Sequence, residues 1–100
     1  MTLGQLIEAL ERMDPDEKPL WGFARPHSYR GYYDQLAFEP AVDVTYGEML
    51  ADARSALGAT YQGWKGGDYT MDAHTNVWIA EEGSTGRSLE FGFSLGGDGW

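Results

Sequence analysis

The side chains best suited to binding an anion gather in two stretches of the chain that contain no Asp or Glu, residues 19–33 and 53–67. The whole chain holds 16 acidic residues, whereas these stretches hold none and include four of its seven basic residues, Arg25, Arg30, Arg54 and Lys65. If the fold brings the two stretches together, they form a positive patch on a protein of net charge −9. Such a patch suits one compact anion, so the pattern favours a small phosphate-bearing ligand.

The first stretch contains the run Pro-His-Ser-Tyr-Arg-Gly-Tyr-Tyr at residues 26–33. Arg30 can hold a phosphate or carboxylate through paired hydrogen bonds, with His27 and Ser28 as further polar contacts. The ring of Tyr29, Tyr32 or Tyr33 can stack on a base. This set of groups resembles a nucleotide pocket.

A second interpretation of the same run stays open. The tyrosines could be half-buried sheet residues, His27 could bond a backbone carbonyl, and Arg30 could pair with Asp34 or Glu39. In that case the run serves the fold and not a ligand.

The second stretch contains Gly-Trp-Lys-Gly-Gly at residues 63–67. Backbone amides near Gly66 can converge on an anion while Lys65 supplies a charge, and Tyr69 adds a ring. The order of glycines and lysine is not that of a Walker A loop. A plain turn is the favoured interpretation of the glycines unless Lys65 and Arg30 are neighbours.

The sequence gives little support to a metal site or to catalysis. His27 and His74 lack the spacing of a known metal site, and we expect no cofactor. Glu39 and Glu82 could form an acid–base pair but also fit as charges at strand ends. A hydrolase that uses Glu39 or His27 as a base is therefore only a third hypothesis.

Two helices are predicted to position these groups. Thr2 with Gln5 and Thr45 with Glu48 have the spacing of a capping box at a helix start. Apolar residues then follow the helical period from Leu3 to Leu10 and from Met49 to Leu57. The Asp14-Pro15-Asp16 cluster stops the first helix, and Gly58 ends the second.

Strands are predicted at residues 19–24, 33–39, 75–81 and 89–95, with residues 26–31 and 83–86 as connections and a short strand at 68–71. The expected fold is α+β, with two helices packed on a four-stranded antiparallel sheet in the order αββαββ. Residues 1–95 would form one domain and residues 96–100 a flexible tail.

A shift of 43 residues superposes several features of the two halves, which makes an internal repeat a hypothesis. It places Thr2 on Thr45, Gly4 on Gly47, Trp21 on Trp64, Leu36 on Ile79, Ala37 on Ala80 and Glu39 on Glu82.

Composition excludes several classes of protein. With 42% hydrophobic residues, no cysteine and no long apolar run, the chain is neither disordered, nor disulfide-stapled, nor a membrane span. Its charge of −9 argues against direct binding to nucleic acid or to an anionic membrane. A cytoplasmic protein fits best, and an edge strand at residues 89–95 could pair in a homodimer.

The segments PHSYRGYYDQLAFEP, TYGEMLADARSALGAT and YQGWKGGDYTM resemble a family of small uncharacterised proteins of bacteriophages and prophages. The resemblance covers roughly residues 2 to 82. Its elements fall on His27, Ser28, Arg30 and Gly31, on residues 37–40 and on residues 63–67, and the chain departs from the pattern after Gly83. The family carries no activity to transfer, but it implies a phage protein that acts in the host cytoplasm, where small acidic proteins often counter host defence.

Two functions follow. In the first, the protein is a non-catalytic binder of a small nucleotide-type ligand, with its site at His27, Ser28, Arg30, Tyr33, Lys65, Gly66 and Tyr69. In the second, its acidic surface imitates nucleic acid and inhibits a host nuclease or CRISPR-type complex.

Overall fold

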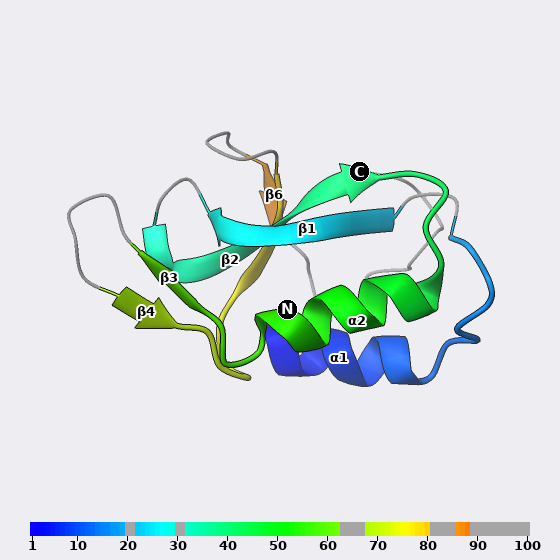
Figure 1. Cartoon of the computed structure of the whole chain (residues 1–100), viewed down its shortest axis with the longest axis horizontal. Coiled ribbons are helices and arrows are strands. Elements are labelled where there is room, and N and C mark those ends of the chain that lie inside the picture. The colour runs from blue at the N-terminus through cyan, green and yellow to red at the C-terminus, as the bar shows by residue number, and fades with distance from the viewer. Residues whose placement is uncertain (20–21, 30–31, 63–67, 81–85, 89–100) are drawn as a thin grey trace.

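Two helices lie side by side beneath a β-sheet, an α+β arrangement (Figure 1). The computed structural model describes residues 1–19, 22–29, 32–62, 68–80 and 86–88. Helices α1 (Leu3–Glu11) and α2 (Tyr46–Ala56) form one layer. Strands β1 (Gly22–Tyr29), β2 (Tyr32–Ala41), β5 (Val77–Ile79) and β6 (Arg87–Ser88) form the other. Within the described residues, no helix is long and apolar enough to cross a membrane.

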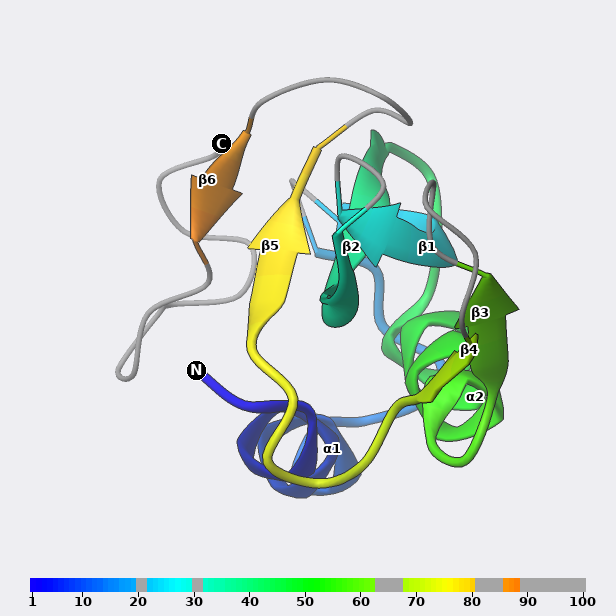
Figure 2. The same cartoon turned by 90° about the vertical axis from the view of Figure 1, so that its left-hand side faces the viewer.

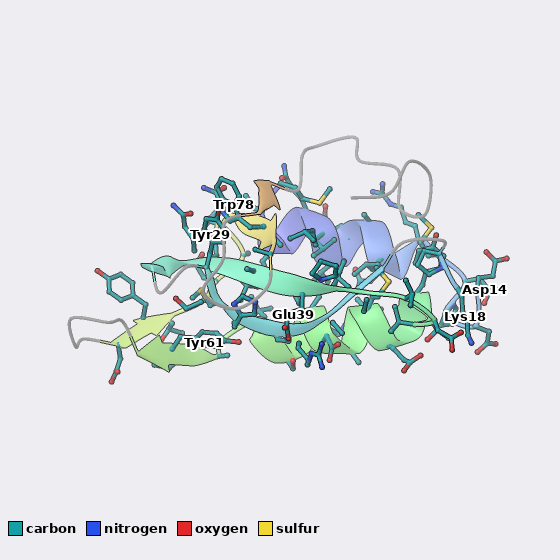
Figure 3. All side chains as sticks on the ribbon, turned by 90° about the horizontal axis from the view of Figure 1, so that it is seen from above. Asp14, Lys18, Tyr29, Glu39, Tyr61 and Trp78 are labelled. Atoms are coloured by element: carbon teal, nitrogen blue, oxygen red, sulfur yellow. The ribbon has the colours of Figure 1, made fainter. Side chains whose placement is uncertain are left out.

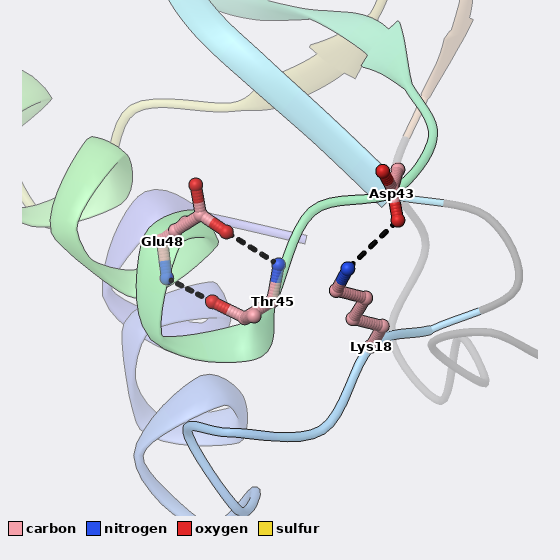
Figure 4. Close-up of polar contacts among 4 residues, drawn as sticks. All are labelled: Lys18, Asp43, Thr45 and Glu48. Carbon is pink, nitrogen blue, oxygen red and sulfur yellow. Dashed lines mark hydrogen bonds and ion pairs between the residues drawn. The ribbon is translucent and has the colours of Figure 1, made fainter.

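Both helices begin at the capping boxes that the sequence predicts. The Thr2 hydroxyl accepts the Gln5 N–H, and the Gln5 side chain accepts the Thr2 N–H. Thr45 and Glu48 repeat the arrangement at 3.0 Å in both directions (Figure 4). The chain leaves α2 through Gly58, whose φ of +84° favours glycine. The two predicted helices are confirmed.

The sheet differs from the all-antiparallel one expected. Its strand order is β1-β2-β5-β6, and β2 and β5 are parallel neighbours, whereas the β1–β2 and β5–β6 pairs are antiparallel. The chain between β2 and β5 includes α2. A helical connection of this length can return the chain to the end of the sheet at which β2 begins, so that β5 runs parallel to β2.

Strand β1 starts later than predicted and extends through residues 26–29, which were expected in the connection. A β-bulge between Ala24 and Pro26 explains the difference, because Arg25 adopts a left-handed conformation with φ of 51°. β1 is an edge strand, where Pro26 has no second neighbour that requires its missing N–H. The predicted strand and dimer edge at residues 89–95 and the predicted tail at 96–100 lie outside the described residues.

A separate hairpin was only half anticipated. Strand β4 (Asp68–Thr70) matches the predicted short strand, but it pairs with β3 (Thr60–Gln62), for which no strand was expected. The two strands form their own two-stranded sheet and project past the end of the main sheet (Figures 1 and 2). The fold therefore contains a four-stranded and a two-stranded sheet instead of one sheet.

The main core lies between the sheet and the helices. Leu36 and Phe38 of β2 face it, and the Phe23 and Phe38 rings lie 4.5 Å apart. The helices contribute buried residues at helical spacing, namely Leu3, Leu6 and Leu10 from α1 and Tyr46, Met49, Ala53 and Ala56 from α2. Because residues alternate along β2, Ala37 lies on the opposite face of the sheet.

Candidate functional site

The structure describes four of the seven predicted ligand-binding residues. His27 and Ser28 lie in β1, Tyr33 is part of β2, and Tyr69 lies in the exposed strand β4. Arg30, Lys65 and Gly66 lie outside the described residues. The meeting of Arg30 with Lys65, on which the nucleotide pocket depends, therefore stays a prediction.

His27 bonds within the protein, as the second interpretation expected. It sits opposite Ala37 of β2, and Ala37 in turn sits opposite Trp78 of β5. The imidazole reaches across the small Ala37 side chain, so that its Nε2 lies 3.0 Å from the carbonyl of Ala80, while Nδ1 lies 3.2 Å from that of Ser28. A carbonyl only accepts, so either contact is a hydrogen bond where the ring nitrogen carries the proton, and this depends on the tautomer. The Nε2 contact reaches from β1 to the end of β5.

A stacked aromatic pair makes the second link over β2. The rings of Tyr29 and Trp78 lie 4.4 Å apart and within 3° of parallel (Figure 3). The Tyr29 hydroxyl accepts the Gly86 N–H at 3.2 Å. We call this side of the sheet, which carries His27, Tyr29, Ala37, Trp78 and Ala80, the outer face.

The outer face is closed by its own side chains. Ala37 is fully buried and Ala80 nearly so, and both form one apolar cluster with Tyr29 and Trp78. The Trp78 Nε1–H is buried and finds no acceptor among the described residues. Sequence reasoning named the tyrosines of this region but missed Trp78, although its alternation with the buried Val77 and Ile79 is the signal of an outward-facing residue.

The acid-free stretches do not leave all their cations unpaired. Arg25 Nε lies 2.7 Å from Glu39 Oε2, and Arg54 Nη2 lies 2.7 Å from Glu11 Oε2. Both carboxylates come from outside the two stretches, because the β-ladder and the contact between α1 and α2 bring distant segments together. Two of the four basic residues expected in a positive patch are thus neutralised by acids.

Arg25 also contacts α2 through its backbone. Its N–H donates to the Asp52 carboxylate, while its side chain pairs with Glu39. Partial burial raises the pKa of Asp52 above its ordinary value, the Arg25 N–H opposes that rise, and the charge of Glu48 adds to it. These two contacts of Arg25 occur at the bulge, which no pattern in the sequence predicted.

The opposite property, a surplus of carboxylates, appears where the turn after α1 meets the start of α2. We call this region the acidic end and define it by five carboxylates and one ammonium, those of Asp14, Asp16, Glu17, Asp43, Glu48 and Lys18. All six residues are exposed. Lys18 Nζ lies 2.8 Å from Asp43 Oδ1 (Figure 4). The hydrogen bond and charge of Asp43, followed by the charge of Glu48, raise the pKa of Lys18.

The backbone holds the acidic end in place. The N–H groups of Tyr46 and Gly47, at the start of α2, donate to the carbonyls of Glu17 and Pro15 at 2.9 and 3.0 Å. Burial, together with the charge of Glu17, raises the pKa of the Tyr46 hydroxyl. Three of the five carboxylates, those of Asp14, Asp16 and Glu17, therefore stand on a turn that is fixed to the helix.

Across the described part of the chain, no three His, Asp or Glu side chains are close enough together to hold a metal ion.

Comparison with protein-family models, with curated proteins and with solved structures finds no match.

Proposed function

We propose that this chain is a non-catalytic binding protein whose acidic end occupies the nucleic-acid-binding surface of a host nuclease or nucleic-acid-guided complex. The observation that carries the proposal is a set of five exposed carboxylates, opposed by one lysine. Asp14, Asp16 and Glu17 stand on a turn that α2 holds fixed, whereas Asp43 and Glu48 lie just before α2 and in its first turn. A nucleic-acid-binding surface is basic, so a fixed group of carboxylates can compete there with phosphates.

The resemblance to small phage proteins fits this proposal, because inhibition of a host nuclease would serve a phage. The small-ligand alternative has less support. Arg25 and Arg54 pair with carboxylates, and His27 bonds to the carbonyl of Ala80.

The first test is inhibition of DNA or RNA cleavage by a panel of bacterial restriction enzymes and RNA-guided nucleases. The protein should inhibit at least one of them, and inhibition should weaken steeply as NaCl rises. If no nuclease in the panel is inhibited at low salt, the proposal fails.

A matched pair of variants then locates the surface. D14N/D16N/E17Q removes three charges from the acidic end, and Asn at position 14 keeps an acceptor for the Asp16 N–H. E8Q/D68N/D72N removes three exposed charges elsewhere and keeps the corresponding acceptor for the His74 N–H. Only the first variant should lose inhibition, by roughly tenfold or more at low salt. Equal losses would show that net charge acts without a defined surface.

A further inference from the structure

Helices α1 and α2 start with the same four-residue device. Thr2 to Gln5 and Thr45 to Glu48 each form a complete capping box, with a glycine as the third residue. The apolar positions also coincide, because the buried Leu3, Leu6 and Leu10 of α1 correspond to Tyr46, Met49 and Ala53 of α2 at a constant shift of 43 residues.

Two turns outside the helices are equally alike. In the turns that start at Asp14 and Asp72, the aspartate Oδ1 accepts the N–H two residues later, at 2.9 and 2.8 Å. In each turn the fourth residue donates its N–H to the aspartate carbonyl, at 3.2 Å in the first and 3.1 Å in the second. Each is an Asx turn that fixes four residues.

Each helix start docks on one of these turns, and the partners are exchanged between the halves. Leu3 and Gly4 donate their N–H groups to the carbonyls of Thr75 and Ala73, at 2.8 and 3.0 Å. Tyr46 and Gly47 donate in the same way to Glu17 and Pro15, at 2.9 and 3.0 Å. The turn after the first helix therefore receives the second helix, and the turn that precedes β5 receives the first.

The glycine in each motif allows the helix start to approach its turn closely. A Cβ on Gly4 would lie 3.1 Å from both the carbonyl oxygen and the Cβ of Ala73. A Cβ on Gly47 would lie 3.0 Å from the carbonyl oxygen and 3.1 Å from the Cβ of Pro15. The ion pair of Glu11 with Arg54 joins positions that are also 43 residues apart, as expected where equivalent residues meet across a local two-fold axis.

The spacing between helix and turn differs between the halves. Thr2 and Thr45 are 43 residues apart, whereas Asp14 and Asp72 are 58 apart, so the second half holds 15 more residues between its helix and its turn. Those residues contain the β3–β4 hairpin, whose strands pair only with each other. All three residues of β4 are exposed, and Tyr61 of β3 packs against the core.

We infer that the chain uses one helix-and-turn docking unit twice, with partners exchanged, and that the β3–β4 hairpin is an inserted arm that the fold does not require. The strand positions that the 43-residue shift superposes, such as Leu36 and Ile79, do not continue this repeat, because the offset between equivalent residues changes from 43 at the helix starts to 58 at the turns. The inference is independent of the proposed function.

The test removes the arm and keeps its base. Met71 N–H donates to the Ala59 carbonyl at 2.9 Å, and the same bond would close a hairpin with only two residues between Ala59 and Met71. Replacing residues 60–70 with Asn-Gly should preserve that bond and the buried Met71. The matched control is Tyr61→Ser in the full-length chain, which removes the packing of Tyr61 and keeps the arm.

The shortened protein should unfold cooperatively, with the helical circular dichroism signal of the wild type. Its Tm should fall by no more than that of Tyr61→Ser, within about 2 °C, because Tyr61 supplies the arm's packing on the core. A shortened protein that is unfolded while Tyr61→Ser is folded would overturn the inference, as would a much larger fall in Tm.

Discussion

The outer face of the sheet and the acidic end both contain side chains that the sequence suggests for binding. Only at the acidic end do those side chains remain exposed to a partner. On the outer face, His27 bonds to the Ala80 carbonyl and Tyr29 stacks on Trp78, so these groups hold β1 to β5. At the acidic end, five carboxylates face water and share one lysine. Reactive side-chain types therefore mark a binding surface only where the fold has not already used them.

The largest effect on this comparison should come from Ala37→Leu. Ala37 is fully buried beneath side chains that cross β2, so a leucine would push apart both links on the outer face. We expect the free energy of unfolding to fall by about 1–3 kcal/mol, which corresponds to a fall in Tm of several degrees for a chain of this size. Thermal unfolding measures it, with Val42→Leu as a control because Val42 is 67% exposed. An unchanged Tm in Ala37→Leu would mean that the outer face is not closed.

A smaller effect should appear in a double-mutant cycle of Tyr29→Ala and Trp78→Ala. Stacked rings typically couple by about 0.5–1.5 kcal/mol beyond their burial. Urea unfolding of the two single variants and the double variant gives the coupling. Additive losses would show that the rings only fill space, and Tyr29→Phe separates stacking from the bond to the Gly86 N–H.

Asp52→Asn should stabilise the protein slightly at neutral pH. Burial raises the pKa of Asp52, so the folded state disfavours its ionised form, and stability falls as pH rises from the ordinary pKa to the raised one. Asparagine avoids that cost and can still accept the Arg25 N–H. The gain should be at most about 0.5 kcal/mol at pH 7, because the group is partly solvated, and should vanish below about pH 3.5.

Urea unfolding of wild type and Asp52→Asn at several pH values measures this difference. A variant that is less stable than wild type at neutral pH would show that the bond from Arg25 outweighs burial.

Lys18→Met should have the smallest effect on stability and a visible one on binding. The Lys18–Asp43 pair is exposed and screened by water, so Tm should not change measurably. Removing the only ammonium of the acidic end should, however, speed association with an inhibited nuclease at low salt. Surface plasmon resonance measures the association rate, and a slower rate would argue against charge-driven binding.

The sequence predicted the helices well because their signals are local. A capping threonine, a glutamine or glutamate three residues later and an apolar period together define each helix start. Strand direction is not local, so nothing in residues 33–39 or 75–81 indicated that β2 and β5 run parallel. The bulge at Arg25 was equally hidden, because the groups that this left-handed arginine contacts, Glu39 and Asp52, lie on other elements.

The candidate site was harder to predict for the same reason. A stretch without acids suggested unpaired cations, but Glu39 and Glu11 reach Arg25 and Arg54 from other parts of the chain. The acidic residues at positions 14, 16 and 17 were visible in the sequence, whereas their attachment to the start of α2 required the fold.

The salt dependence of binding decides whether the acidic end binds a nuclease through its charge. For an inhibited nuclease, log Kd should be measured against log [NaCl] for wild type, D14N/D16N/E17Q and E8Q/D68N/D72N. We expect a steep slope for wild type and for the distant variant, and a shallower slope with weaker binding for the acidic-end variant alone. A slope near zero for wild type, or equal slopes for the two variants, would contradict it.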